Sequence, residues 1–181
     1  WPTTLAVGKL SMNYSGEPNG LDAIHGDEAE GWRTMTDIKD ASGRQMIEQV
    51  HFLSTMLVGK EVTLKNLRDA AALVHAPLLL VYLQADDHRE GYNSAGMAYW
   101  TIVGLFTVPG NTVGQFSVCQ AILVDTRTGL VLATIQGESK REENVLYGAV
   151  NIARDRIETQ TQKEAANQLQ NSFRKTIEEL K

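Results

Sequence analysis

Apolar runs broken by polar turn residues divide this chain into predicted strands and helices. The segment from Met97 to Ser139 holds three runs rich in aromatic and β-branched residues, a composition typical of strands. Asp125–Gly129 separates the last two runs, because Asp can accept a backbone hydrogen bond locally and Gly accepts a positive φ. Pro109-Gly110-Asn111 separates the first two. We therefore predict an antiparallel meander with strands over Met97–Val108, Gln115–Val124 and Leu130–Gln136.

Further apolar runs predict strands before this meander. Thr4–Leu10 alternates and then becomes more apolar, which favours a strand in the centre of a sheet. Leu78–Leu83 is apolar throughout, as expected of a strand that is buried on both faces. Val50–Leu57 is also predicted as a strand, and Trp32–Thr36 as a short edge strand.

Two polar stretches between these runs predict loops. Ser15–Gly31 is rich in Gly, Asp, Glu, Asn and Pro, residues that bury little surface. We expect it to form a mobile surface loop. Ala85–Gly96 is also polar and turn-rich, and predicts a second loop.

Two segments predict helices. In Thr63–His75 apolar residues recur on one helical face, Thr63 can cap the first turn, and Ala76-Pro77 ends the helix because proline lacks the next donor. Asn144–Lys181 predicts one long helix or two in tandem. Its apolar stripe should pack across the sheet and comprises Ile157, Ala165, Leu169, Phe173, Ile177 and Leu180.

Together these elements predict a single α+β domain over residues 1–181. We expect a mostly antiparallel twisted sheet, with a central helix and a long C-terminal helix packed on it. A chain of 181 residues and 20.0 kDa is long enough to bury a core and fits one domain.

Composition and charge exclude several classes of function. The net charge of −5 lacks the clustered Lys and Arg that neutralise phosphates, so nucleic acid is not an expected partner. The longest apolar run, Met97–Val108, is much shorter than the roughly 20 residues of a spanning helix. The single cysteine, Cys119, excludes an internal disulfide and a Cys-based metal cluster, and its apolar strand favours burial over reactivity.

No motif in the sequence assembles an active site. There is no Gly-x-Ser-x-Gly elbow, no dinucleotide fingerprint and no phosphate loop. Two acidic clusters contain histidine, but solvated loops explain them better than metal binding, because their spacing matches no strong metal motif. The clusters are Asp86-Asp87-His88 with His75, and His25 with Asp22, Asp27 and Glu28. We therefore predict no enzyme activity, no cofactor and no metal site.

The segment from Tyr99 to Phe106 is the candidate interaction site. It is apolar at both odd and even positions, so a strand formed there needs cover on both faces. A helix of the same chain would supply burial, and a partner or second subunit would make it an interface. The candidate interface residues are Tyr99, Trp100, Ile102, Leu105 and Phe106.

Four segments together resemble bacterial envelope lipoproteins of the rhombotarget type. They are Leu67–Ala72, Leu78–Tyr82, Tyr99–Gly104 and Val124–Val131. More distantly, the predicted order of strand, helix, buried strand, meander and terminal helix is similar to the curli-secretion lipoprotein and TolB amino-terminal folds. The resemblance covers residues 60–181.

This resemblance implies a periplasmic domain that is tethered to the membrane through a lipidated cysteine upstream of Trp1. It carries no catalytic residues to transfer to this chain. We therefore expect a non-catalytic cell-envelope lipoprotein domain that acts in protein interaction or envelope assembly, with an envelope protein or a second copy as its partner. The alternative is a domain that binds a small ligand or cell-wall fragment through the loops Ser15–Gly31 and Ala85–Gly96.

Overall fold

The computed structural model describes residues 3–12, 18–59, 61–92, 111–145 and 150–179. By internal contacts the chain divides into two compact units. The first unit comprises Trp1–Gln84, Cys119–Gly137 and Ala166–Lys181, and the second comprises Ala85–Val118 and Glu138–Ala165. The expectation of a single domain stays a prediction.

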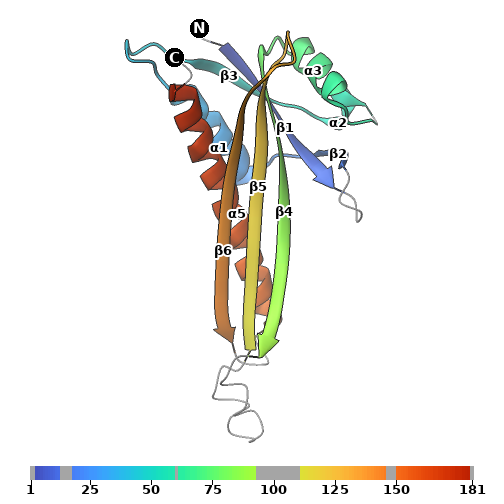
Figure 1. The fold of residues 1–181 in the computed structure, drawn as a ribbon, viewed down its shortest axis with the longest axis vertical. Coiled ribbons are helices and arrows are strands. Elements are labelled where there is room, and N and C mark those ends of the chain that lie inside the picture. The colour runs from blue at the N-terminus through green and yellow to red at the C-terminus, as the bar shows by residue number, and fades with distance from the viewer. Residues whose placement is uncertain (1–2, 13–17, 60, 93–110, 146–149, 180–181) are drawn as a thin grey trace, which may run out of the picture. The chain divides into compact units, whose positions relative to one another are not determined.

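The described elements alternate strands with short helices before three long strands and a long terminal helix (Figure 1). In chain order they are β1 Thr3–Met12, β2 Pro18–Asp22, α1 Gly26–Arg33, the 3-10 helix η1 Thr34–Asp37, β3 Ile47–Phe52, α2 Thr55–Val58, α3 Leu64–Leu73, β4 Leu78–Tyr92, β5 Asn111–Asp125, β6 Val131–Val145 and α5 Val150–Glu179. Strands β4, β5 and β6 and helix α5 each contribute residues to both units.

In the first unit the sheet has the order β2-β1-β4-β5-β6, and β3 also pairs with β1. Strand β1 lies parallel to β4, from Leu5 beside Leu78 to Leu10 beside Leu83, and parallel to β3. It lies antiparallel to β2. The predicted α+β class and the central place of β1 are confirmed, and the sheet is mixed, because β1 has parallel partners on both sides.

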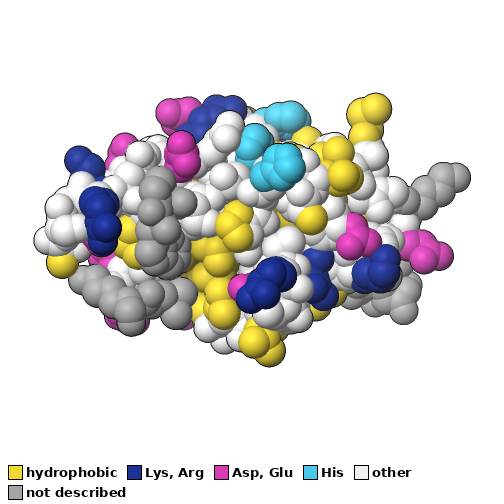
Figure 2. Space-filling model, turned by 90° about the horizontal axis from the view of Figure 1, so that it is seen from above, with side chains coloured by type: hydrophobic (Ala, Val, Ile, Leu, Met, Phe, Trp, Pro, Cys, Tyr) yellow, Lys and Arg dark blue, Asp and Glu magenta, His cyan; other side chains and the backbone are white. Residues whose placement is uncertain are grey.

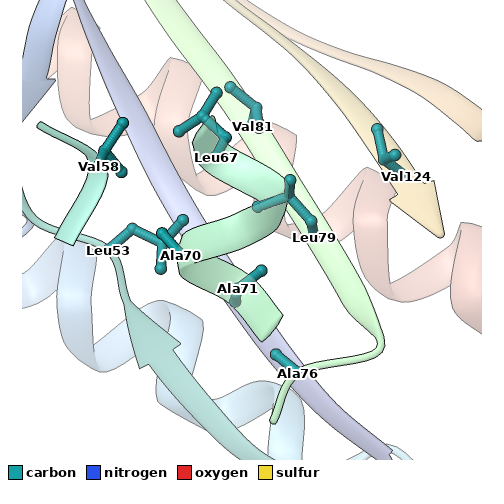
Figure 3. Packing of buried hydrophobic residues seen from close by; sticks show 10 residues of the cluster. Leu53, Val58, Leu67, Ala70, Ala71, Ala76, Leu79, Val81 and Val124 are labelled. Carbon is teal, nitrogen blue, oxygen red and sulfur yellow. The ribbon is translucent and has the colours of Figure 1, made fainter. Parts of the chain in front are cut away.

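Helix α3 covers part of one sheet face. Its buried residues Leu67, Ala70 and Ala71 face Leu79 and Val81 of β4 (Figure 3). The Thr63 hydroxyl caps the helix by accepting a hydrogen bond from the Asn66 amide, as the sequence predicted. The helix over Thr63–His75 is thus confirmed to within a residue or two at each end.

Aromatic side chains fill the core on the other sheet face. The ring of Trp32 lies 5.6 Å from the ring of Tyr82 and 5.6 Å from that of Phe173, centroid to centroid. All three side chains are fully buried. Phe173 belongs to the predicted stripe of the C-terminal helix, and Ile157, Ala165, Leu169 and Ile177 of that stripe are buried as well.

Two predictions for the region before β3 are wrong. The loop predicted over Ser15–Gly31 contains β2 and most of α1, whose first turn carries Asp27 and Glu28, charges that favour a helix N-terminus. The edge strand predicted over Trp32–Thr36 is the end of α1 followed by η1. Packing of Trp32 in the core overrides the strand preference of its side chain.

Three further boundaries differ from the sequence prediction. Strand β4 continues to Tyr92, so most of the polar loop predicted over Ala85–Gly96 is strand, because polar residues can occupy strand positions once the backbone is paired. Strand β3 begins at Ile47, and the end of the strand predicted over Val50–Leu57 is helix α2. The strand predicted over Met97–Val108 lies outside the described residues.

Candidate binding groove

A groove of about 440 Å³ opens on the sheet of the first unit. Four strands contribute to it, and its volume lies within the range of small-molecule sites. The lining residues are Leu10 of β1; Val81, Tyr82 and Leu83 of β4; Gln120, Ala121 and Ile122 of β5; and Thr134, Ile135 and Gln136 of β6.

The groove is open because α3 covers only part of its sheet face. A ten-residue helix is about 15 Å long. Leu79 and Val81 belong to the cluster beneath α3, but Leu83, the next β4 residue on that face, is half-buried. Leu10 and Ile122 pack against the margin of the same cluster and are also only partly buried. The sheet therefore presents aliphatic side chains to solvent beside the helix.

The polar side chains in the groove carry no charge. Gln120, Thr134 and Gln136 are exposed and offer amide and hydroxyl groups. Of the lining residues only Tyr82 has a titratable side chain, which is buried in the core on the other sheet face, where its hydroxyl donates a 2.8 Å hydrogen bond to Glu28 Oε1. Burial, and then the Glu28 charge, raise the pKa of Tyr82 far above its ordinary value. The groove thus combines a concave surface, apolar side chains and hydrogen-bonding groups, which are the features of a binding site.

The Glu28 carboxylate joins α1 to the sheet. Lys9 Nζ lies 3.1 Å from both Glu28 carboxylate oxygens and 5.9 Å from the centre of the Tyr82 ring. Gln170 of α5 donates a 3.0 Å hydrogen bond to the Glu28 backbone carbonyl. Each partner comes from a different element, so the spacing of these residues in the sequence could not predict the cluster. Its groups satisfy one another, which is the pattern of a structural anchor.

The predicted turn at Asp125–Gly129 is confirmed. Asp125 Oδ1 accepts hydrogen bonds from the Thr128 amide and hydroxyl, which lower the pKa of the Asp125 carboxyl, and Gly129 has a φ of 77°. Arg68 of α3 donates 2.9 Å hydrogen bonds to the carbonyls of Thr126 and Arg127. These contacts hold α3 to the turn, and they account for the polar residues of the turn without a catalytic role.

Of the candidate residues that the sequence singled out, the structure describes only members of the histidine-containing clusters, and those described are not grouped as a metal site. The interface candidates Tyr99, Trp100, Ile102, Leu105 and Phe106 lie outside the described residues. His25 is exposed before α1, and His75 is exposed after α3 with a φ of 55°. Asp86 lies in β4, where its carboxylate accepts hydrogen bonds from Ser117 and Gln162.

Histidine side chains appear close together on the face seen from above, beside hydrophobic side chains (Figure 2). Within the described ranges, however, no three or more His, Cys, Asp or Glu residues are grouped so that they could hold a metal ion. Within the same ranges no helix is long and apolar enough to cross a membrane.

No protein-family model matches the chain, and no curated protein does. Solved structures are similar to it at low identity. The LpoB C-terminal domain from Salmonella enterica has 12% identity and a TM-score of 0.39, and the match covers 77% of this chain and 84% of that one. Lipoprotein GNA1162 from Neisseria meningitidis has 13% identity and a TM-score of 0.37, with 88% and 97% covered.

The PelC dodecamer from Paraburkholderia phytofirmans has 17% identity and a TM-score of 0.34, and the match covers 92% of this chain and 88% of that one. Similarity at this level carries no argument about function, which must be argued from the residues of this chain.

Proposed function

We propose that the protein is a non-catalytic binding domain of the bacterial cell envelope, and that a protein partner docks in the groove of the first unit. The observation that carries this proposal is the open sheet face, where half-buried Leu10, Leu83 and Ile122 lie among uncharged polar side chains. Apolar side chains lie accessible beside a packed helix. A partner that covers them removes apolar surface from water, which lowers the free energy of the complex.

The chemistry of the groove favours binding over catalysis. A hydrolase or transferase needs a nucleophile, an acid or a base within hydrogen-bond reach of its substrate. The side chain of Tyr82, the one titratable lining residue, is buried on the other sheet face and bonded to Glu28, and Gln120, Thr134 and Gln136 are neutral hydrogen-bonding groups. Such groups orient a ligand without reacting with it.

The envelope location rests on the segments that resemble envelope lipoproteins, Leu67–Ala72, Leu78–Tyr82, Tyr99–Gly104 and Val124–Val131. In this proposal a lipidated cysteine upstream of Trp1 anchors the protein in the membrane. Substitution of that cysteine by serine in the full gene product should move the protein from the membrane fraction to the soluble periplasmic fraction. A gene whose product begins in the cytoplasm without a signal sequence would contradict this location.

Site-specific photo-crosslinking in the native cell tests the docking. A photoreactive residue at Ile122 should trap a partner, because this position lines the groove. The matched control is Ile152 of α5, which is 73% exposed and lies in the second unit. Equal crosslinking from both positions, or none from Ile122, would contradict docking in the groove.

A small ligand is the second candidate occupant, and the groove volume of about 440 Å³ favours it. The amides of Gln120 and Gln136 could hydrogen-bond a sugar or peptide fragment of the cell wall. This site replaces the loops Ser15–Gly31 and Ala85–Gly96, which are largely strand and helix where described. A thermal-shift screen with envelope metabolites tests it, and a flat response across the panel counts against a small ligand.

A further inference from the structure

The first half of α5, residues 150–165, belongs to the second unit and packs there through small and polar side chains. Among the side chains that the structure describes in this half, the buried ones are Ala153, Ile157, Thr161 and Ala165, and one of these is a large apolar residue. Among the described strand side chains of the same unit, the buried ones are Gln115, Ser117 and Ser139, all of them polar. Hydrophobic stabilisation grows with buried apolar area, so this contact gains little from it.

Hydrogen bonds between α5 and the strands confirm that these polar side chains lie under the helix. Ser139 of β6 donates a 2.8 Å hydrogen bond to Glu164. Gln162 donates a 3.0 Å hydrogen bond to the Asp86 carboxylate of β4, which also accepts one from Ser117. Asp86 is exposed, so water can replace these bonds at little cost when the helix moves away.

The side chain of Gln115 is left without hydrogen bonds by this packing. It is 2% exposed, and within the described structure neither its amide nitrogen nor its amide oxygen has a hydrogen-bond partner. It lies two positions from Ser117 along β5 and therefore on the same strand face. A buried amide without partners has lost the hydrogen bonds that water would provide, so it favours an arrangement that exposes it.

The sequence of this half also favours a helix only weakly. β-branched residues occupy five of the twelve positions from 150 to 161, whereas positions 162–175 hold none. Such side chains lose rotational freedom in a helix. The hydroxyls of Thr159 and Thr161 donate hydrogen bonds to backbone carbonyls four positions earlier, a contact that slightly destabilises a helix.

The second half of α5 has the opposite character. Its residues Leu169, Phe173 and Ile177 are at most 1% exposed and belong to the core of the first unit. Segments with few buried apolar contacts open before segments with many. The two halves of one helix should therefore differ in the free energy that their local opening requires.

We propose that residues 150–165 separate from the strands of the second unit as a local opening, favoured by the unpaired Gln115 amide, while residues 166–179 stay packed in the first unit. The opening hydrates the Gln115 amide and breaks hydrogen bonds that water replaces. It uncovers the polar side chains of Gln115, Ser117 and Ser139 and leaves the core of the first unit intact. The fold thus contains a helical segment that can open without global unfolding.

Thiol labelling of the native protein compares the two units. Cys119, the single cysteine of the chain, is 0% exposed and belongs to the first unit. Thr161 is also 0% exposed, so Thr161→Cys combined with Cys119→Ala moves the single thiol to the buried face of the opening segment. Each rate is divided by the rate of the same thiol in denaturant. The thiol of Thr161→Cys should then react at least about tenfold faster than Cys119, because local opening needs less free energy than global unfolding. Equal rates would overturn the proposal.

Gln115→Leu tests the cause of the opening. Leucine has a similar size and no polar side-chain atoms, so it removes the unpaired amide and should slow the labelling of Thr161→Cys several-fold. The matched control is Gln49→Leu, which replaces an exposed glutamine of β3 in the first unit and should leave the rate unchanged. A rate that Gln115→Leu does not change, or that both variants slow equally, would contradict the proposal.

Amide hydrogen exchange of the parent protein tests the opening without any substitution. At neutral pH residues 150–165 should exchange faster than residues 166–179, because a helical segment that has left its strands is marginally stable in water. Equal protection of the two halves would overturn the proposal. These outcomes do not depend on the groove, whose lining residues all belong to the first unit.

Discussion

The two halves of α5 attach to the sheet by different forces. In the first unit Leu169, Phe173 and Ile177 are fully buried, and the Phe173 ring packs edge-on against Trp32. In the second unit the helix is joined to β6 by an ion pair between Arg141 and Glu164, and Ser139 also donates a 2.8 Å hydrogen bond to Glu164.

The size of the buried side chains accounts for this difference. The buried face of the helix in the second unit presents mainly Ala153, Ile157, Thr161 and Ala165, three of which are small. The face in the first unit presents Leu169, Phe173 and Ile177. Hydrophobic stabilisation grows with buried apolar area, so the second half of the helix gains more from packing. One helix can therefore be attached in two ways: by apolar packing, which salt does not weaken, and by an ion pair, which salt and pH can weaken.

The largest effect is expected from removal of the aromatic ring in the first unit. Phe173→Ala should lower the free energy of unfolding by about 3–5 kcal/mol, because it leaves a cavity beside Trp32. Denaturant titration measures the loss. Phe116→Ala is the matched control, since Phe116 is 37% exposed, and should cost much less. Similar losses for the two variants would break the comparison.

A buried polar contact of the first unit should have an intermediate effect. Tyr82→Phe removes the hydroxyl that donates to Glu28, and hydrogen bonds to charged groups contribute about 1.5–3 kcal/mol. We expect a loss near the lower end, because Lys9 remains paired with the carboxylate. Thermal unfolding at neutral pH measures it. A variant as stable as the parent would show that the hydroxyl serves no anchoring role.

A smaller effect is expected from the ion pair of the second unit. Arg141→Gln should destabilise the protein slightly, because exposed ion pairs are screened by water and contribute little. The loss should shrink further as salt is added, since salt screens exposed charges. Parallel unfolding curves at low and high ionic strength check this. A loss as large as that of Phe173→Ala, or one that salt does not change, would contradict the distinction between the two halves.

The smallest effect is a local response to pH. The hydrogen bonds from Arg141 and then Ser139 hold the pKa of Glu164 below its ordinary value of 4.5. A carboxyl with a lowered folded-state pKa contributes stability above its unfolded-state pKa, and this contribution is lost as pH falls through the folded-state value. Amide exchange in residues 150–165 should therefore accelerate, relative to residues 166–179, as the solution is acidified below pH 4.5. Glu164→Gln is the control and should remove the difference.

The sequence alone was sufficient to predict those features whose backbone conformation depends on neighbouring residues. Thr63 caps α3 through the Asn66 amide, and Asp125 with Gly129 forms the turn between β5 and β6. Each of these features depends on residues within a few positions of one another. The interface predicted over Tyr99–Phe106 stays a prediction, because those residues lie outside the described structure.

Tertiary structure decided the features that depend on contacts between distant residues. Trp32 is helical because its ring packs on Tyr82 and Phe173, and local strand preference cannot reveal such a contact. The binding groove arises because α3 is too short to cover Leu83 and Ile122, which are far apart in sequence. The sequence determined the class of the fold and its local turns, whereas the accessible surfaces depended on which apolar positions the fold left uncovered.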